Sequence, residues 1–128
     1  MARLFALVAA MAVAACDFST LPPDGAPPGV VLAAYLRALE RGDCMTARSL
    51  TTSTFIVGNG ELCGVLDVTA FTGPDGGARP SDNELVYSTT LTTRGGDGSM
   101  PDGDHIWFYS LVRQPDGEWR IAGGGSGP

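Results

Sequence analysis

The spacing of apolar residues predicts two helices in the first half of the chain. Four apolar residues share the i, i+3, i+4, i+7 spacing of one helical face: Leu32, Tyr35, Leu36 and Leu39. This spacing predicts an amphipathic helix over residues 30–41, which Gly42 can end in the left-handed conformation. Asp43 can then cap a shorter helix over residues 44–50.

The apolar period changes to two in the second half of the chain. Residues 51–60 are predicted to be irregular and residues 61–66 to form a turn of helix. Four β-rich runs follow, over residues 66–72, 84–94, 105–113 and 118–122. Glycine and proline cluster between the runs, and the short connections favour an antiparallel meander.

The third run, HIWFYSLV, carries apolar residues on both of its faces. This pattern predicts a central strand covered on both sides, by the helices on one side and by an aromatic-lined hollow on the other. The predicted fold class is therefore α+β, with N-terminal helices packed on a curved antiparallel sheet of about four strands.

The N-terminus has the pattern of an export signal. Arg3 precedes an apolar run over residues 4–15, whose helical length of about 18 Å is too short for a hydrocarbon core of about 30 Å. The following Cys16 completes a Val-Ala-Ala-Cys sequence that resembles the bacterial lipobox, in which the cysteine is acylated. The alternative is an ordinary signal peptide cut after Ala15, which leaves Cys16 as an incidental thiol.

These features predict an extracytoplasmic protein that acylated Cys16 anchors to the lipid of the cell membrane. Residues 1–15 are the signal peptide, and residues 16–29 are the lipidated cysteine with a proline-rich tether. Residues 30–123 form one domain, and residues 124–128 a flexible tail.

The charge of the chain argues against nucleic acid as a partner. All 8 basic residues of the 128 are arginine, against 14 acidic residues, and the net charge is -6. No basic patch is available to neutralise a phosphate backbone, so nucleic-acid binding is not expected.

The number of cysteines predicts one disulfide. If Cys16 carries lipid, Cys44 and Cys63 remain as a pair in an exported domain, where such a bridge is common. The alternative is two buried free thiols. A redox or zinc site is disfavoured because the chain has no CxxC sequence and no histidine beside either cysteine.

The order of these parts resembles a known superfamily. The first predicted helix ends in Tyr35-Leu36-x-Ala38-Leu39-x-x-Gly42-Asp43, the second holds Cys44-x-x-Ala47-x-x-Leu50, and the last strand is Gly117-x-Trp119-Arg120-Ile121. Over residues 28–123 the chain resembles the nuclear transport factor two-like superfamily with its SnoaL-like proteins, in particular its actinobacterial lipoproteins. The resemblance implies a cone-shaped fold with a pocket between the first helix and a concave sheet, and leaves both enzymes and binding modules open.

Few residues are candidates for chemistry. The aromatic residues Tyr35, Tyr87, Trp107 and Tyr109 can line a hydrophobic ligand pocket, or simply pack in the core. His105, with Asp104 or Asp67 as its partner, is a weak catalytic candidate, because a histidine at a strand end is more often exposed to solvent.

The loop before His105 holds three acidic residues, Asp97, Asp102 and Asp104. Their carboxylates can attract calcium, but their spacing does not match the twelve-residue calcium loop and favours a solvated turn. The sequence therefore predicts no metal and no cofactor.

The leading functional hypothesis is a non-enzymatic envelope lipoprotein that binds a small apolar ligand or a partner protein. The alternative hypothesis is a small isomerase, cyclase or hydrolase that uses His105 and a nearby aspartate.

Overall fold

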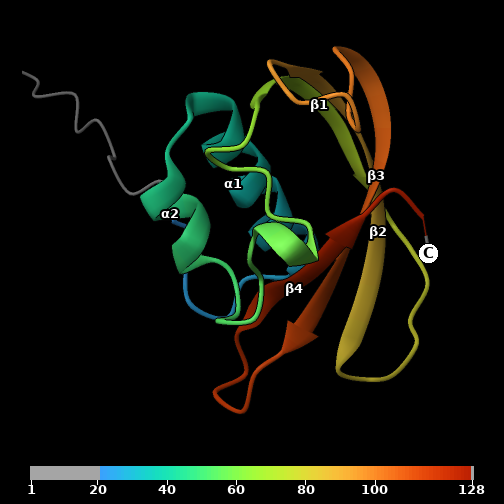
Figure 1. The fold of residues 1–128 in the computed structure, drawn as a ribbon. Coiled ribbons are helices and arrows are strands. Elements are labelled where there is room, and N and C mark those ends of the chain that lie inside the picture. Colours follow the sequence, from blue (N-terminus) through green and yellow to red (C-terminus); the bar gives the residue numbers. More distant parts are fainter. Residues whose placement is uncertain (1–20, 128) are drawn as a thin grey trace, which may run out of the picture.

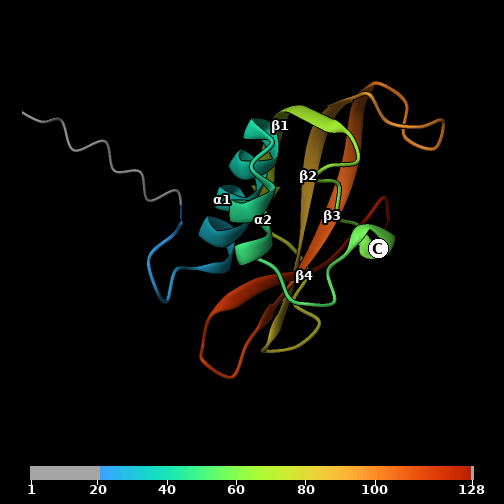
Figure 2. The same ribbon diagram turned by 60° about the vertical axis from the view of Figure 1, so that its left-hand side comes forward.

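Two helices pack against one face of an antiparallel sheet in the computed structural model, which describes residues 21–127 (Figure 1). The sheet curves around the helices, and Figure 2 shows both helices on the same side of the strands. The predicted signal peptide and Cys16 lie outside the described residues. The coarse α+β prediction is confirmed.

The first helix, α1 (Pro28–Arg41), begins and ends as its sequence predicts. Pro27 precedes it, and Pro28 occupies a first-turn position where its missing N–H costs no hydrogen bond. Gly42 ends the helix with a left-handed φ of 66°, which glycine adopts without strain. The predicted apolar face, with Leu32, Tyr35, Leu36 and Leu39, is buried.

The second helix, α2 (Cys44–Ser49), is held at its start by a side-chain cap. Asp43 accepts a hydrogen bond from the Thr46 N–H at 3.1 Å and another from the Thr46 hydroxyl at 2.6 Å. These bonds hold the pKa of the Asp43 carboxyl below its usual value. The predicted disulfide joins Cys44 to Cys63, with 5.7 Å between their Cα atoms.

Residues 61–66 are not the turn of helix that the sequence predicts. A short 3-10 helix, η1 (Val57–Asn59), comes before them, and the chain then makes a hydrogen-bonded turn from Val65 N–H to the Leu62 carbonyl. Gly64 lies in this turn with a φ of 84°. That left-handed conformation cannot continue a right-handed helix.

The strands form the predicted meander. They are β1 (Asp67–Asp75), β2 (Glu84–Arg94), β3 (Gly103–Arg113) and β4 (Trp119–Gly125), paired antiparallel in the order β1-β2-β3-β4. The third strand is central, as predicted, because β3 lies between β2 and β4.

The prediction that β3 is covered on both sides is wrong. Tyr109 and Leu111 are fully buried in the same core cluster as α1, and Trp107 packs against this cluster. Ile106 alternates with Trp107, and its side chain is 61% exposed. Since successive strand residues point to opposite faces, Trp107 and Tyr109 lie on the helix-covered face, and Ile106 and Phe108 lie on the other, which no described helix covers.

The ends of the domain extend beyond the predicted limits. Strand β4 runs to Gly125, so part of the predicted tail belongs to the sheet. In the predicted tether, Ala26 is buried and the Gly25 N–H donates to the Glu118 carboxylate at 2.7 Å. The last residues before α1 therefore pack against the turn between β3 and β4.

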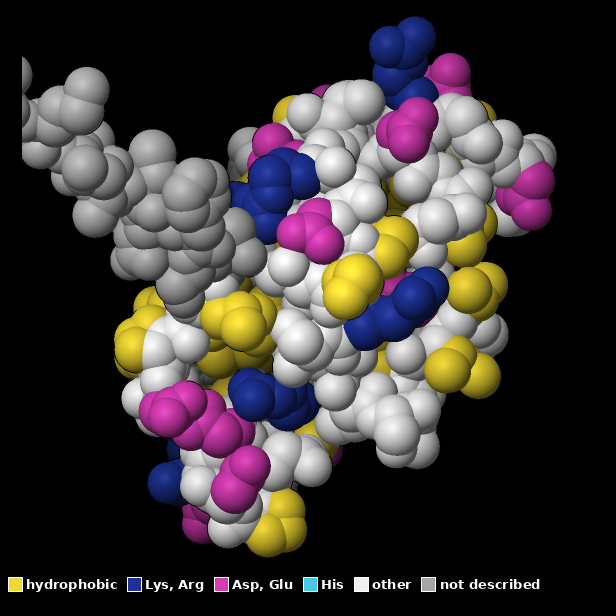
Figure 3. All heavy atoms as spheres, turned by 90° about the vertical axis from the view of Figure 1, so that its left-hand side faces the viewer, with side chains coloured by type: hydrophobic (Ala, Val, Ile, Leu, Met, Phe, Trp, Pro, Cys, Tyr) yellow, Lys and Arg dark blue, Asp and Glu magenta, His cyan; other side chains and the backbone are white. Residues whose placement is uncertain are grey.

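On the face that carries the helices, arginine and acidic side chains are interspersed with apolar ones (Figure 3). This face presents no continuous basic surface among the described residues. No helix within residues 21–127 is both long and apolar enough to cross a membrane.

Candidate functional site

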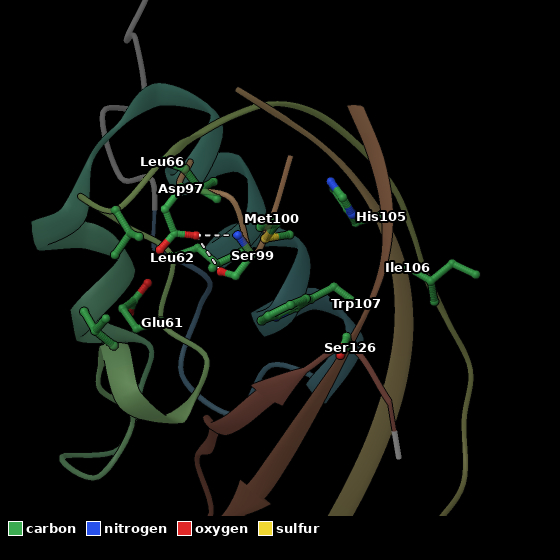
Figure 4. A pocket seen from close by; sticks show the side chains of 12 residues that line it. Glu61, Leu62, Leu66, Asp97, Ser99, Met100, His105, Ile106, Trp107 and Ser126 are labelled. Carbon is green, nitrogen blue, oxygen red and sulfur yellow. Dashed lines mark hydrogen bonds between the residues drawn. The ribbon is translucent and has the colours of Figure 1, made fainter. Parts of the chain in front are cut away.

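A cavity of about 430 Å³ opens between the segment that precedes β1, the loop from β2 to β3, and strand β3 (Figure 4). Its apolar lining comes from Val57, Leu62, Val65, Leu66, Met100 and Trp107, while Ile106 borders it with a side chain that points away from the cavity. Five residues with polar side chains complete the lining: Glu61, Asp97, Ser99, His105 and Ser126. A hollow in which apolar side chains meet polar groups can hold a small molecule that has both an apolar and a polar part.

Glu61 provides a buried carboxylate in the cavity wall. Its side chain is only 5% exposed. Oxygen Oε1 accepts hydrogen bonds from the Tyr35 hydroxyl at 2.7 Å and from the Cys63 N–H at 2.8 Å. Oxygen Oε2 is buried and has no hydrogen-bond partner in the structure. A buried polar atom without a partner is costly, so Oε2 is the atom at which a ligand gains most.

The chain on both sides of Glu61 fixes its position. Gly60 ends η1 with a φ of 103°, and a Cβ atom there would lie 2.3 Å from the Gly124 carbonyl oxygen. Only glycine allows this close approach to β4. Two residues after Glu61, Cys63 is linked to α2 by the disulfide. Glu61 is thus held between two constrained positions.

Three aromatic rings pack behind the Glu61 carboxylate. Tyr35 lies edge-on to Phe55 and to Tyr109, with ring centroids 5.9 and 5.6 Å apart. Burial raises the pKa of the Tyr35 hydroxyl well above its usual value, and the nearby Tyr109 and Glu61 raise it further. Burial, and then Glu61, likewise raise the pKa of Tyr109. Both hydroxyls therefore stay protonated. The Tyr35 hydroxyl donates to Glu61, whereas the Tyr109 hydroxyl is buried without a hydrogen-bond partner in the structure.

Trp107 provides the aromatic wall of the cavity. Its indole Nε1 is buried and has no hydrogen-bond partner in the structure. A Cβ atom on Gly124 would lie 2.9 Å from this nitrogen and 3.3 Å from the Tyr109 ring. The glycine in β4 therefore leaves the space that the two aromatic side chains occupy.

The four predicted pocket aromatics do not act as one set. Only Trp107 lines the cavity, while Tyr35 and Tyr109 are fully buried beside Glu61. Tyr87 lies near the start of α1, where a Cβ atom on Gly29 would be 3.8 Å from its hydroxyl. The predicted aromatic pocket is thus divided between a cavity wall and the core.

His105 lines the cavity, but neither of its predicted partners does. Asp104 is the next residue on the strand and accepts a hydrogen bond from the Thr92 hydroxyl at 2.6 Å. Adjacent strand residues point to opposite faces, so Asp104 and His105 do not form a pair. Asp67 is exposed and lines a different hollow. The His105 ring nitrogen Nε2 instead lies within hydrogen-bond distance of the Pro101 carbonyl.

The three loop carboxylates each take a separate hydrogen bond. Asp97 accepts from Ser99, Asp102 from the Gly95 N–H, and Asp104 from Thr92. The bonds from Ser99 lower the pKa of Asp97. Within residues 21–127, no group of three histidine, cysteine or acidic side chains is placed to hold a metal ion.

Glu61 is the functional candidate that sequence reasoning misses. It stands at the start of ELCGVL, a short segment without a clear period, and the predicted turn of helix gave its carboxylate no partner. The sequence does hold one indication of its role: Glu61 is a single acidic residue in an otherwise apolar segment, two positions before the disulfide cysteine Cys63.

No model of a known protein family matches the sequence, and no curated protein matches it at a significant level. The geometry of the cavity is therefore the basis for the functional proposal.

The buried hydroxyls lead to a prediction about alkaline pH. Of the three tyrosines, we expect only Tyr87 to ionise in the folded protein, since it is half-buried rather than enclosed. Above the usual tyrosine pKa of about 10, the unfolded chain loses the protons of Tyr35 and Tyr109 while the folded protein keeps them. The free energy of unfolding therefore falls as the pH rises above about 10. Phenolate absorbance should thus show one early ionisation and two that accompany unfolding. Three ionisations in the folded protein would contradict the burial of this cluster.

Proposed function

We propose that the domain binds a small, largely apolar molecule in the Glu61–Trp107 cavity and carries out no reaction on it. The observation that carries the proposal is the cavity itself, with its apolar lining and the unpartnered Oε2 of Glu61. The polar side chains of the lining can orient a ligand whose body packs on the apolar ones.

Exposed apolar side chains near the cavity support entry of such a molecule. Val57 and Val65 line it and are 62% and 43% exposed. Ile56 is also exposed and lines a second hollow of about 490 Å³, which shares Val57 and Glu61 with the first. An apolar partner protein is the other occupant that such a rim can accept.

The protonation of the site favours binding over proton transfer. The Tyr35 and Tyr109 hydroxyls are held neutral, and Oε1 of Glu61 already accepts two hydrogen bonds. Oε2 of Glu61 keeps free lone pairs, but a general base also needs a route for the proton that it takes. The tyrosines provide no such route.

A second candidate function is acid–base catalysis by His105 and Glu61. The specific observation in its favour is that both side chains line the same cavity, whereas Asp104 does not. It predicts turnover that His105→Ala abolishes. The binding function instead predicts that this variant still binds ligand.

We also propose that the protein is an envelope lipoprotein of the nuclear transport factor two-like superfamily, anchored through acylated Cys16. The proposal is supported by the lipobox-like sequence and by an antiparallel meander with helices on one face.

The anchor is tested with the full-length protein in a bacterial host. We expect the protein in the membrane fraction, with the mass of an acylated chain that begins at Cys16. Cys16→Ala should release it into the soluble fraction. An unmodified Cys16 in exported wild-type protein would refute the anchor.

Ligand binding is tested in two variants, each of which keeps one of the two tryptophans as its fluorophore. In Trp119→Phe the remaining fluorophore is Trp107, which lines the cavity, and we expect saturable emission changes on addition of 1-hexanol. In the matched Trp107→Phe variant, Trp119 reports from the β3–β4 end of the sheet and should not respond. Equal responses from the two variants, or none, would contradict binding in this cavity.

A further inference from the structure

We infer that the cavity selects apolar molecules that carry a protonated amine, and that the Glu61 carboxylate is the group that recognises the ammonium. This inference rests on the proposed function, since it identifies the class of ligand for the same cavity.

The two oxygens of Glu61 differ in a way that favours an external donor. Tyr35 and Cys63 both donate to Oε1 and hold the carboxylate in one orientation. Oε2 receives no hydrogen bond, although the side chain is more than nine-tenths buried and lines the cavity. An ammonium placed against Oε2 supplies both the missing donor and the opposite charge.

Within residues 21–127, no ion pair supplies a positive charge to Glu61. The ion pairs within residues 21–127 are Arg41 with Asp43 and Arg120 with Glu118. Arg48 lines the second hollow together with Glu61, makes no ion pair with it and is exposed to solvent. No arginine lines the main cavity, so Glu61 faces it without a cation.

The charge of the lining disfavours the opposite class of ligand. Glu61 and Asp97 are the acidic residues of the lining, and His105 is its remaining titratable residue. A ligand carboxylate in this cavity would lie near a buried acid without a compensating cation, which is unfavourable in an apolar site. A neutral hydroxyl can donate one hydrogen bond to Oε2, but it leaves the charge of Glu61 unbalanced.

Trp107 adds a second contact for the same head group. It is the aromatic residue of the lining, and its side chain projects from β3 toward the segment that holds Glu61 (Figure 4). Aromatic rings attract ammonium groups through their negative faces. The rest of the lining, with Leu62, Leu66 and Met100, suits an alkyl or aryl body.

Three probes of the same length test the inference on the wild-type domain: hexylammonium, 1-hexanol and hexanoate, compared by calorimetry at neutral pH and constant ionic strength. We expect hexylammonium to bind at least about tenfold more tightly than 1-hexanol, because its charge adds to the apolar contact. Hexanoate should bind most weakly of the three.

The variant Glu61→Gln removes the charge and keeps a carbonyl oxygen that can accept from Tyr35 and Cys63. We expect it to lose the preference for hexylammonium and to bind 1-hexanol as the wild type does. The matched control is Glu40→Gln, which removes an equal charge from an exposed position on α1 and should leave the preference intact.

The outcomes separate the inference from the proposed function. Equal affinity of the wild type for hexylammonium and 1-hexanol overturns the inference and leaves apolar binding in place. A preference that persists in Glu61→Gln also overturns it. If none of the three probes binds, the proposed function fails and the inference with it. Should Glu61→Gln not fold, the order of the three affinities in the wild type still decides.

Discussion

The hydrogen bond from the Tyr35 hydroxyl to the Glu61 carboxylate connects the core of the domain to its cavity. Tyr35 is fully buried on α1, and Glu61 lies in the segment between η1 and β1. A carboxylate in this position must be compensated, since burying an unpaired charge costs far more than a hydrogen bond returns. The bond therefore fixes the position of the 61–66 segment, and with it one wall of the cavity.

The opposite wall depends on close packing between β3 and β4. Gly124 leaves room for Trp107 and Tyr109, and the same residue lies against Gly60 just before Glu61. Both walls thus depend on one short region of β4, where a side chain larger than hydrogen would collide with its neighbours. The shape of the cavity therefore depends on Gly60 and Gly124 as much as on the side chains that line it.

The regular elements follow from patterns that the sequence carries locally. The helical spacing around Tyr35, the cap at Asp43 and the change to a period of two predict α1, α2 and the meander, and all are present. The Cys44–Cys63 pairing follows from counting cysteines in an exported chain. Each of these depends on short-range chemistry or on composition.

The site was harder to predict because it depends on contacts between distant residues. Glu61 gains its role from Tyr35, 26 positions earlier in the chain, and no period indicates that contact. The prediction of an aromatic-lined hollow on the side of β3 away from the helices fails for Trp107 and Tyr109, because strand alternation alone does not say which face a helix covers. The same alternation does separate Asp104 from His105, and the sequence already contained that information.

The most direct test of this account is a double-mutant cycle on Tyr35→Phe and Glu61→Leu, measured by chemical denaturation. Each single variant should leave a buried polar partner unsatisfied, whereas the double variant removes both members of the bond. We therefore expect the double variant to be more stable than the sum of the single effects by about 1.5 to 3 kcal/mol, the range for hydrogen bonds to charged groups. Single effects that simply add would show that Tyr35 and Glu61 are not coupled, and would contradict the account.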